Sequence, residues 1–432
     1  MEWLGKVPEH WDVSPLKAVA THNDDVLDET TSPDSEIFYV DISSVDPIDG
    51  ITAKETMLFS AAPSRARRRV KHGDVIVSTV RTYLRAIARV RDPEENLVVS
   101  TGFAVIRPGM KLVADYLGYI VSASYFVEQV IARSTGVSYP AINASELVAI
   151  PVAIPPLPEQ TQIAACLDRE TAKIDELVAE QRRLMALLKE KRQAVISHAV
   201  TRGLNPDAPL KPSGIEWLGD VPEHWDLKPI KYLGKIISGF AFKSGDFTPD
   251  GVRVLKIANI QTYAIDWTDD SYVPESFYQA HSSFSVSNGD VVFALTRPII
   301  STGLKAAIAD IGEELVLLNQ RNAIFRPSAT LNKHFIYHFL FSNSFRIDFE
   351  NKIDATGQQP NISPIDIGEI RIPLPPIQEQ AAIGMHLNAI TYEFDTLTTE
   401  TQRAIDLLQE RRTALISAAV TGQIDVRGLV AA

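Results

Sequence analysis

Basic and aromatic side chains in the first third of this chain have the types and spacing needed to bind a polyanion. Guanidinium groups contact phosphate oxygens, and they also reach the edges of bases, where a tyrosine can join them. A run of this kind is equally a common feature of a solvated surface, so the sequence leaves both interpretations open. The residues are Arg65, Arg67, Arg68, Arg69 and Lys71, followed after one predicted strand by Arg81, Tyr83 and Arg85.

A second set of candidate binding residues lies in the other half of the chain and is richer in amides. Arginine and lysine suit guanine edges, whereas asparagine and glutamine suit adenine edges. Each of these residues could instead occupy a plain surface position. The set is Lys243, Lys256, Asn259, Gln261, Arg297, Gln320, Arg321, Asn322, Gln358 and Gln359.

The sequence shows no arrangement of residues that would support catalysis. The stretch Gly239–Gly245 contains a lysine and a serine but lacks the spacing of a phosphate-binding loop. The nine histidines have no metal-binding spacing, and the single cysteine, Cys166, permits neither a disulfide nor a cysteine-based metal site. We therefore expect a chain that is not an enzyme and holds no metal or cofactor of its own.

Charge and hydropathy limit the partners and the compartment. The net charge of −12 argues against nonspecific coating of a polyanion, although local basic patches remain compatible with it. No apolar run is long enough to span a bilayer, and the first residues lack the basic start and apolar stretch of a signal peptide. These features predict a cytoplasmic protein.

The elements that must position the candidate residues come in two copies. A segment with two tryptophans, Glu2–Asp12, recurs as Glu216–Asp226, and the block Pro155–Gln160 recurs as Pro375–Gln380. A repeat of half the chain length indicates two tandem modules rather than a stacked solenoid. We call the two repeated N-terminal pieces the Trp segments.

Shorter pieces are shared by the strand-rich stretches that follow each Trp segment. Because the shared pieces are turn and strand signatures, we expect them to be scaffold, and we expect the unshared residues to differ in specificity. The matches are Gly73–Arg81 with Gly289–Arg297, Ala104–Pro108 with Ala323–Pro327, and Thr135-Gly136 with Thr356-Gly357.

Each Pro-Pro block opens a long helical pattern whose apolar residues alternate spacings of three and four, which is typical of a coiled coil. The first stripe contains Ile163, Leu167, Ile174, Leu177, Leu184, Leu188 and Val195, and it passes through Glu170, Gln181, Lys191 and His198. The second contains Ile383, Leu387, Ile390, Phe394, Leu397, Ala404, Leu408, Leu415 and Ala418. The polar positions Glu170, Gln181 and Lys191 either are reserved for water or for another subunit, or are tolerated boundary positions.

The order of these segments predicts an α+β fold with two mixed, strand-rich domains and two long helices. If the repeat symmetry holds, the helices run antiparallel as an intramolecular coiled coil, and the chain is pseudo-twofold and circular in organisation. The predicted segments are the N-terminal Trp segment at 1–16, domain 1 at 17–150, the first helix at 151–204, a linker and second Trp segment at 205–229, domain 2 at 230–372, and the second helix with the C-terminal tail at 373–432.

Several motifs in this order resemble a known family. They are the Trp segments with the pattern Glu-Trp-Leu-Gly-x-Val-Pro-Glu-His-Trp, the helix start Pro155–Ile163, and the stretches Ser238–Ser244 and Lys256–Ile260. Together they resemble the specificity subunit of type I restriction-modification systems, over the whole chain. The cluster Arg65–Lys71 has no assigned target in this resemblance.

The resemblance implies a noncatalytic subunit in which two target recognition domains each read half of a bipartite, asymmetric site in double-stranded DNA. The helices would set the spacer and dock two methyltransferase subunits, which carry S-adenosylmethionine and methylate adenine. Two motor-nuclease subunits, which use ATP and Mg, would join for restriction. Two alternatives remain: a specificity subunit of a fused or orphan methylation system, and a coiled-coil scaffold that joins two protein-binding domains.

Overall fold

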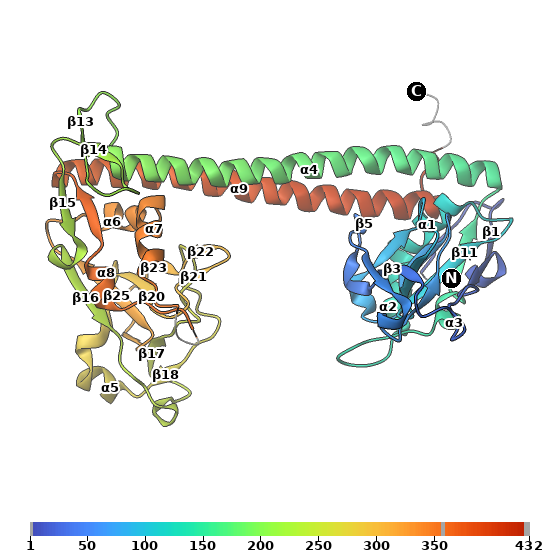
Figure 1. Cartoon of the computed structure of the whole chain (residues 1–432), viewed down its shortest axis with the longest axis horizontal. Coiled ribbons are helices and arrows are strands. Elements are labelled where there is room, and N and C mark those ends of the chain that lie inside the picture. Colours follow the sequence, from blue (N-terminus) through green and yellow to red (C-terminus); the bar gives the residue numbers. More distant parts are fainter. Residues whose placement is uncertain (1–2, 356–358, 427–432) are drawn as a thin grey trace. The chain divides into compact units, whose positions relative to one another are not determined.

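The structure, a computed structural model, describes residues 3–355 and 359–426, and its chain divides into two compact units (Figure 1). Unit 1 runs from the N-terminus to Arg182 and includes the residues from Gln402 onward, whereas unit 2 is Arg183–Thr401. Helix α4 spans Leu157–Arg202 and helix α9 spans Ile377–Val420, so each unit holds part of both helices. The prediction of an α+β fold with two strand-rich domains and two long helices is confirmed.

Unit 1 contains two four-stranded sheets. The first is antiparallel throughout and has the order β2-β11-β8-β9, whereas the second has the order β6-β3-β10-β7 with a parallel pair at its centre, β3 with β10. The strands of the first sheet are β2 Ala20–His22, β11 Phe103–Pro108, β8 Val75–Ser78 and β9 Ile87–Arg89. Those of the second are β6 Glu55–Leu58, β3 Glu36–Val40, β10 Leu97–Ser100 and β7 Ala66–Arg69.

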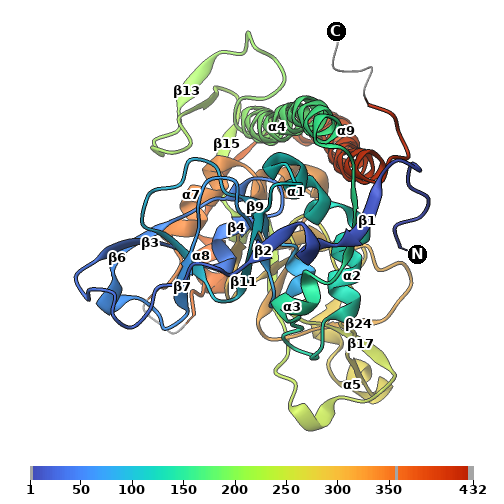
Figure 2. The ribbon, with the colours of Figure 1, turned by 90° about the vertical axis from the view of Figure 1, so that its right-hand side faces the viewer.

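Two layers of apolar side chains hold unit 1 together. Ile76 and Phe103 are fully buried in the cluster shared by the two sheets. Helices α1 (Ala114–Ser122) and α2 (Ser124–Arg133) form the other layer, together with the start of α4 and the end of α9 (Figure 2). Full burial of side chains of this size stabilises the fold by about 1.5–3 kcal/mol each.

Unit 2 repeats this topology strand for strand. Its sheets have the orders β16-β25-β20-β23 and β18-β17-β24-β19, and β17 with β24 is again the parallel pair. The strands are β16 Gly234–Ser238, β25 Asn322–Pro327, β20 Val291–Ala294, β23 Ala306–Ile308, β18 Tyr272–Val273, β17 Val252–Leu255, β24 Val316–Leu318 and β19 Ser285–Val286. Two sequences with only short shared motifs therefore specify one fold.

The shorter α-helices in the described ranges of the two units also correspond, with one addition in unit 2. Helices α6 (Lys333–Leu340) and α7 (Asn343–Asn351) of unit 2 follow its sheets as α1 and α2 do in unit 1. Short helices precede the last strands, α3 (Ala144–Leu147) in unit 1 and α8 (Pro364–Gly368) in unit 2. Unit 2 further contains α5, Glu275–Ala280.

The strand after each Trp segment pairs with the strand that leads into a long helix. Strand β1 (Asp12–Pro15) is antiparallel to β12 (Pro151–Ile154), and β15 (Asp226–Pro229) is antiparallel to β26 (Arg371–Leu374). Asp12 faces Ile154 in the first register just as Asp226 faces Leu374 in the second. The predicted helical segments, which began at residues 151 and 373, thus start with residues of a β-strand before each helix begins.

The two repeated motifs meet in space at the start of each helix. In unit 1, His10 Nε2 lies 3.0 Å from Glu159 Oε2, and in unit 2, His224 Nε2 lies 2.8 Å from Glu379 Oε2. The indole of Trp225 donates a second hydrogen bond to Glu379. Motifs that are distant in sequence thus form one structural contact, twice.

The glutamine that ends each Pro-Pro block is a buried link between loop and helix. Gln160 is fully buried; its carbonyl accepts a hydrogen bond from Val113 N at 2.8 Å, and its amide donates to the Lys111 and Pro155 carbonyls. Gln380 makes the three equivalent bonds in unit 2. Because a buried amide without partners is costly, these bonds explain the repeated glutamine.

The buried face of the long helices differs from the predicted heptad stripe. Ile163, Leu167 and Ile174 are buried as predicted, but the buried stripe then continues through Val178, whereas Leu177 is 45% exposed. An α-helix has 3.6 residues per turn, so its inward face drifts away from a strict 3.5-residue repeat. Thr171, rather than Glu170, is the buried residue on this stripe. The charged side chain of Glu170 therefore does not interrupt the buried face as predicted.

The same drift affects the other exposed leucines. Leu184 and Leu397 are 42% and 46% exposed, so the prediction that they and Leu177 pair the helices is wrong, although partner docking remains a prediction for them. Ile383, Leu387 and Phe394 are buried as predicted. The other predicted positions, which are half-buried, are Leu188, Val195, Ile390, Ala404, Leu408, Leu415 and Ala418.

Within each unit an arginine of one long helix reaches an aspartate of the other. Arg412 Nε of α9 lies 2.9 Å from Asp175 Oδ1 of α4 in unit 1, and Arg192 Nε of α4 lies 3.4 Å from Asp395 Oδ1 of α9 in unit 2. In unit 2 the guanidinium of Arg192 also lies over the ring of Tyr263, 4.2 Å from its centre.

None of the helices in the described ranges is both long and apolar enough to cross a membrane.

Candidate nucleic-acid interface

The first predicted basic group lies on β7, an edge strand of the second sheet of unit 1. Much of its charge is balanced locally. Arg65 donates to Asp41 at 2.7 Å and to the Tyr39 hydroxyl at 3.0 Å, and Lys71 pairs with Asp25 at 2.8 Å. This group therefore presents less free positive charge than its sequence indicates.

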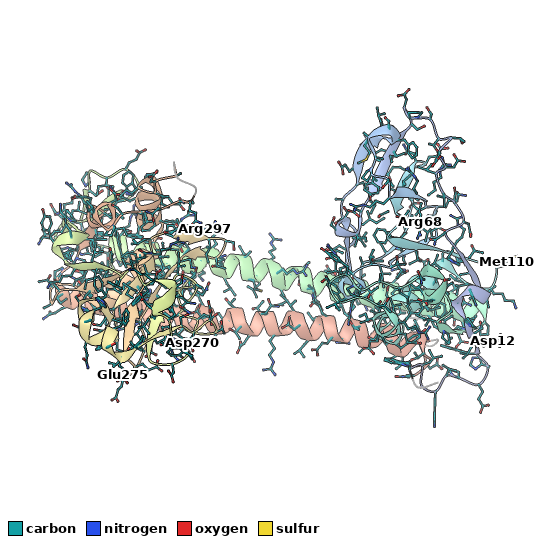
Figure 3. All side chains as sticks on the ribbon, turned by 90° about the horizontal axis from the view of Figure 1, so that it is seen from below. Asp12, Arg68, Met110, Asp270, Glu275 and Arg297 are labelled. Carbon is teal, nitrogen blue, oxygen red and sulfur yellow. The ribbon has the colours of Figure 1, made fainter. Side chains whose placement is uncertain are left out.

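The other members of that group diverge in direction. Arg67 stacks on Phe59, with its guanidinium 4.8 Å from the ring centre. Arg68, labelled in Figure 3, has a buried Nη1 with no hydrogen-bond partner, and burial lowers the pKa of its guanidinium. Arg69 is exposed. The structure thus does not gather these residues into one surface.

The second predicted group forms one tight turn between β8 and β9. Arg81 and Arg85 both have a left-handed backbone, with φ of 51° and 52°, and they flank the 3₁₀ turn Thr82–Leu84. Thr82 is buried and its hydroxyl lies 2.8 Å from that of Ser134, whereas Tyr83 and Leu84 are 52% and 43% exposed. The turn therefore holds its aromatic and basic side chains outward.

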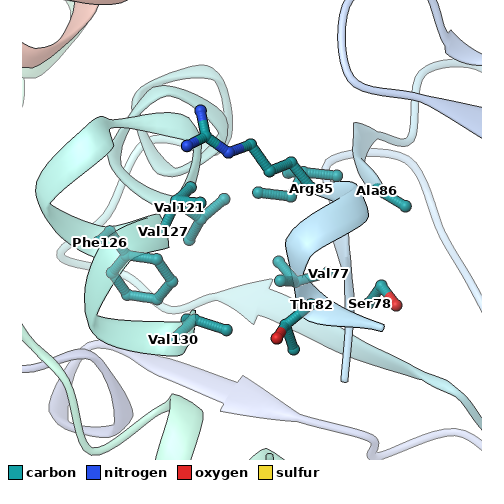
Figure 4. A pocket seen from close by; sticks show the side chains of 10 residues that line it. Val77, Ser78, Thr82, Arg85, Ala86, Val121, Phe126, Val127 and Val130 are labelled. Carbon is teal, nitrogen blue, oxygen red and sulfur yellow. The ribbon is translucent and has the colours of Figure 1, made fainter. Parts of the chain in front are cut away.

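An apolar base fixes this turn on helix α2. Phe126, Val127 and Val130 of α2 face Thr82 and Arg85 across a cavity of about 10 Å³ (Figure 4). A cavity of that size holds at most one water molecule. The turn is consequently packed against a rigid element.

A second loop, residues 134–140, supports the Arg81 turn. Arg81 N donates to the Pro140 carbonyl at 2.8 Å, and Ile142 N donates to the Thr79 carbonyl at 2.9 Å. The Arg81 guanidinium lies over the Tyr139 ring, 4.7 Å from its centre. Tyr139 is 63% exposed; it was not predicted, although the repeated Thr-Gly before a proline pointed to this loop.

The turn carries positive charge without a partner in the described part of the chain. Across residues 3–355 and 359–426, neither Arg81 nor Arg85 forms an ion pair. Arg85 lines an open groove of about 500 Å³ whose other side is formed by α9, including Asp406 and Glu410. The groove is open, unlike the enclosed, mostly apolar pockets that hold small ligands.

Unit 2 builds the same turn around Arg297. Its φ is 46°, its N–H donates to the Pro360 carbonyl at 2.8 Å, and Ile362 N donates to the Leu295 carbonyl at 2.9 Å. Arg297 is exposed, and it is labelled in Figure 3. Gln359 lies half-buried on the supporting loop, and Gln358 lies outside the described residues.

Two further candidates lie beside Arg297. Gln320 and Arg321 are exposed in the turn between β24 and β25. The Arg321 carbonyl accepts a hydrogen bond from Leu295 N at 2.8 Å, which brings this turn next to the Arg297 turn. Asn322, in contrast, is buried and its amide donates to the Leu255 carbonyl, so it supports the turn.

The loop after β17 divides its predicted residues between structure and surface. Asn259 is 1% exposed, and its amide donates to the Asp266 and Asp269 carbonyls, so we correct its assignment from base contact to loop structure. Lys256 pairs with Asp269 at 2.9 Å, and Gln261 donates to the Ala258 carbonyl at 2.8 Å.

The last candidate, Lys243, lies just before a short 3₁₀ turn of unit 2. Lys243 is exposed, and its backbone N–H donates a hydrogen bond to the Asp246 carboxylate at 2.7 Å. No group of three or more histidine, cysteine, aspartate or glutamate side chains in the described ranges could hold a metal ion. The exposed polar side chains of both units have hydrogen-bonding groups of the kind that contact nucleic acids.

Comparison with known proteins decides what these loops belong to. The family described as the type I restriction modification DNA specificity domain matches residues 49–183 and 222–407, which is most of both mixed domains and of both helices. The chain belongs to the specificity subunits of type I restriction-modification systems. The resemblance seen in the Trp segments and helix starts is thereby confirmed.

Individual relatives of this chain are themselves specificity subunits of type I restriction enzymes. The type I restriction enzyme MjaVIII specificity subunit of Methanocaldococcus jannaschii is 28% identical over 299 residues, covering 69% of this chain and 68% of that protein. The EcoKI specificity subunit of Escherichia coli strain K12 is 23% identical over 326 residues, covering 74% and 68%.

A solved structure supports the fold of this specificity subunit. It comes from work on complex assembly and conformational transition of the type I R-M system, and it is similar with a TM-score of 0.77 at 22% identity. The similarity covers 97% of this chain and all of that one. The fold therefore extends to the Trp segments and helices as well as to the sheets.

Proposed function

We propose that this specificity subunit is noncatalytic and that each mixed domain reads one half of a bipartite site in double-stranded DNA. The observation that carries the proposal is the turn that both domains build after an equivalent strand, with an exposed arginine that has a left-handed backbone. The side chains around the two turns differ, which is what an asymmetric site requires. One good bidentate contact discriminates between bases by about 1–3 kcal/mol, so a few contacts per domain suffice.

The long helices supply surfaces for partners. Leucines at equivalent positions of the repeat point away from the buried stripe: Leu177 and Leu187 of α4 are 45% and 53% exposed, and Leu397 and Leu407 of α9 are 46% and 55% exposed. Exposed leucines that recur in this way favour docking of two copies of one partner. We propose two methyltransferase subunits there and, for restriction, two motor-nuclease subunits.

The reactive groups of the assembly belong to those partners in this proposal. S-adenosylmethionine binds the methyltransferase, which methylates one adenine per half-site, and ATP with Mg binds the motor-nuclease. The specificity subunit contributes position, because its two domains select the bases and its helices set the spacer between them. The same subunit could equally serve a fused or orphan methylation system.

Methylome sequencing tests this proposal directly. Cells that express the subunit with its own methyltransferase should methylate one bipartite motif, and cells that express the methyltransferase alone should not. A contiguous motif, or methylation that is independent of the subunit, would refute the division into two half-sites.

The spacer role has its own experiment. Insertion of four residues into both α4 and α9 lengthens each helix by about 6 Å. The proposal predicts a longer spacer with both half-sites unchanged, and a control insertion in the linker near Ala208 should leave the motif as it is. A changed half-site would contradict the separation of reading from spacing.

A further inference from the structure

Six residues other than glycine have a left-handed backbone in the described part of the chain, and three of them are arginines in the turns described above: Arg81, Arg85 and Arg297. This conformation is uncommon outside glycine and is enriched in asparagine and aspartate, not in arginine. Residues held in it against their preference cluster at functional sites, where surrounding bonds fix them. Both turns show such fixing bonds.

The support is the same in both domains. Arg81 N and Arg297 N each donate to a proline carbonyl, Pro140 or Pro360, at 2.8 Å. Each supporting loop then returns through an isoleucine N–H bonded to the strand end before the arginine, at 2.9 Å in both cases. The backbone of either arginine is thereby fixed from two sides while its side chain stays exposed.

Another arginine that the two domains share is paired with a buried aspartate within its own domain. Arg107 forms two hydrogen bonds to the buried Asp74, at 2.8 and 2.7 Å, and Arg326 forms two to the buried Asp290, at 2.9 and 2.6 Å. Arg81 and Arg297 have no carboxylate partner in the parts of the chain that the structure describes. The presence of an arginine at the same place in both domains therefore has a structural explanation for Arg107 and Arg326, but none for Arg81 and Arg297.

We infer that Arg81 and Arg297 are matched specificity-determining residues, each reading a base edge, most simply a guanine, in its own half-site. The inference rests on the proposed function and adds the residues that carry it. A fixed backbone orients the planar guanidinium, whose fork matches the O6 and N7 atoms of guanine in the major groove. In domain 1, Tyr139 acts as a positioning residue because its ring lies against the Arg81 guanidinium.

Glycine substitutions separate the side chain from the backbone. Arg81→Gly and Arg297→Gly keep a residue that adopts positive φ easily, so the turn is retained while the guanidinium is lost. The full chain, assembled with its methyltransferase, would be used to select from a DNA library randomised over both half-sites, and the selected DNA would be sequenced. Asp92→Gly is the matched control, because Asp92 also has positive φ, 44°, and lies in another loop of domain 1.

The inference predicts that Arg81→Gly lowers the preference at one base pair of one half-site by about tenfold, the effect of losing one bidentate contact. Arg297→Gly should do the same in the other half-site only. Arg81→Lys should resemble Arg81→Gly, since lysine keeps the charge but lacks the fork. Asp92→Gly should select the same site as the unaltered chain.

The other outcomes are informative. Equal weakening on all sequences, with Arg81→Lys restoring affinity, would make Arg81 a phosphate contact and overturn the inference, as would unchanged selection. Tyr139→Ala should partly relax the same base pair and Tyr139→Phe should not. If the unaltered assembly selects no bipartite site, the proposed function fails and the inference with it. Equal melting temperatures for the unaltered and glycine chains would show that folding is intact.

Discussion

Domain 1 and domain 2 have the same strand order in their two four-stranded sheets, yet the surfaces around their equivalent turns differ. Near Arg81 the exposed side chains are aromatic and apolar, Tyr83, Leu84 and Tyr139, whereas near Arg297 they are polar, Gln320 and Arg321 among them. The shared motifs lie in the scaffold up to the arginine that ends one of them, Arg81 or Arg297, and the differences lie around that arginine. The comparison teaches that recognition can diverge while the positions that present it stay constant.

A buried position shows the same principle inside the fold. In unit 1, the Tyr119 hydroxyl donates to Asp168 Oδ1 at 2.6 Å, and Arg89 reaches the same carboxylate at 2.9 Å. In unit 2, His338 on α6 and Asn388 on α9 occupy the equivalent positions, and His338 Nε2 lies 2.8 Å from Asn388 Oδ1. One contact between domain and helix is therefore kept with charged chemistry in one unit and neutral chemistry in the other.

The largest expected effect tests whether the scaffold is truly shared. Asp74→Ala and Asp290→Ala each remove a buried carboxylate and leave its arginine without that carboxylate partner, so each should lower the free energy of unfolding by about 3–4 kcal/mol. Urea unfolding of the full chain measures both. Asp92→Asn, at a side chain that is 95% exposed and in a left-handed backbone that asparagine also adopts, is the control and should change it by less than about 0.5 kcal/mol. Unequal losses in the two domains would break the comparison.

The next effect distinguishes the units by pH. Burial lowers the pKa of His338 from 6.5 to about 4. Between those values the unfolded chain binds a proton that the folded chain does not, so stability falls as the pH drops from 6.5 to 4, by up to about 3 kcal/mol. His338→Gln should flatten this part of the profile of unfolding free energy against pH.

A matched change supports that assignment. His386→Gln alters an exposed histidine of α9 and should leave the slope in place. A profile for His338→Gln that still falls between pH 6.5 and 4 by the full amount would assign the loss to other groups and remove this difference between the units.

A smaller effect checks which face of α4 is buried. Val178→Ala deletes about two buried methylene equivalents and should cost about 1.5 kcal/mol of unfolding free energy. Leu177→Ala, one residue away on the exposed face, should cost less than about 0.5 kcal/mol but weaken binding of the methyltransferase. The strict heptad predicts the reverse order in urea unfolding.

The smallest expected effect concerns the two arginine turns. In Arg81→Gly and Arg297→Gly, glycine removes the strain of the left-handed backbone, which stabilises the folded chain, but it also raises the entropy of the unfolded chain, which destabilises the fold. Because the two effects oppose each other, the free energy of unfolding should change by less than about 0.5 kcal/mol in each case. A loss of several kcal/mol for either one, in the same urea measurements, would give that arginine a structural role and make the two turns unequal.

The repeated motifs allowed much of the fold to be predicted, because each has a structural cause. The Trp segments and Pro-Pro blocks meet at His10 and Glu159, and the strands beside them pair in one register. The predicted heptad was wrong at Leu177, because an apolar pattern that repeats every 3.5 residues gradually rotates around a helix that has 3.6 residues per turn. Local spacing could not reveal that drift.

The candidate site was less predictable, because composition does not show which side chains the fold neutralises. Arg65 and Lys71 looked like free charge but are paired with aspartates distant in sequence. Asn259 looked like a base contact but is buried in its own loop. The left-handed backbone of Arg81 and the stacking of Tyr139 depend on a second loop, which only the folded chain brings near.

The most direct test of two separate readers on one scaffold is to replace residues 16–150 with a second copy of 230–370. The junctions match, since Leu16 N bonds the Ile150 carbonyl at 3.0 Å and Ile230 N bonds the Ile370 carbonyl at 2.9 Å. Methylome sequencing of cells that express this chain with its methyltransferase should give an inverted repeat of the second half-site. Persistence of the first half-site would contradict the account.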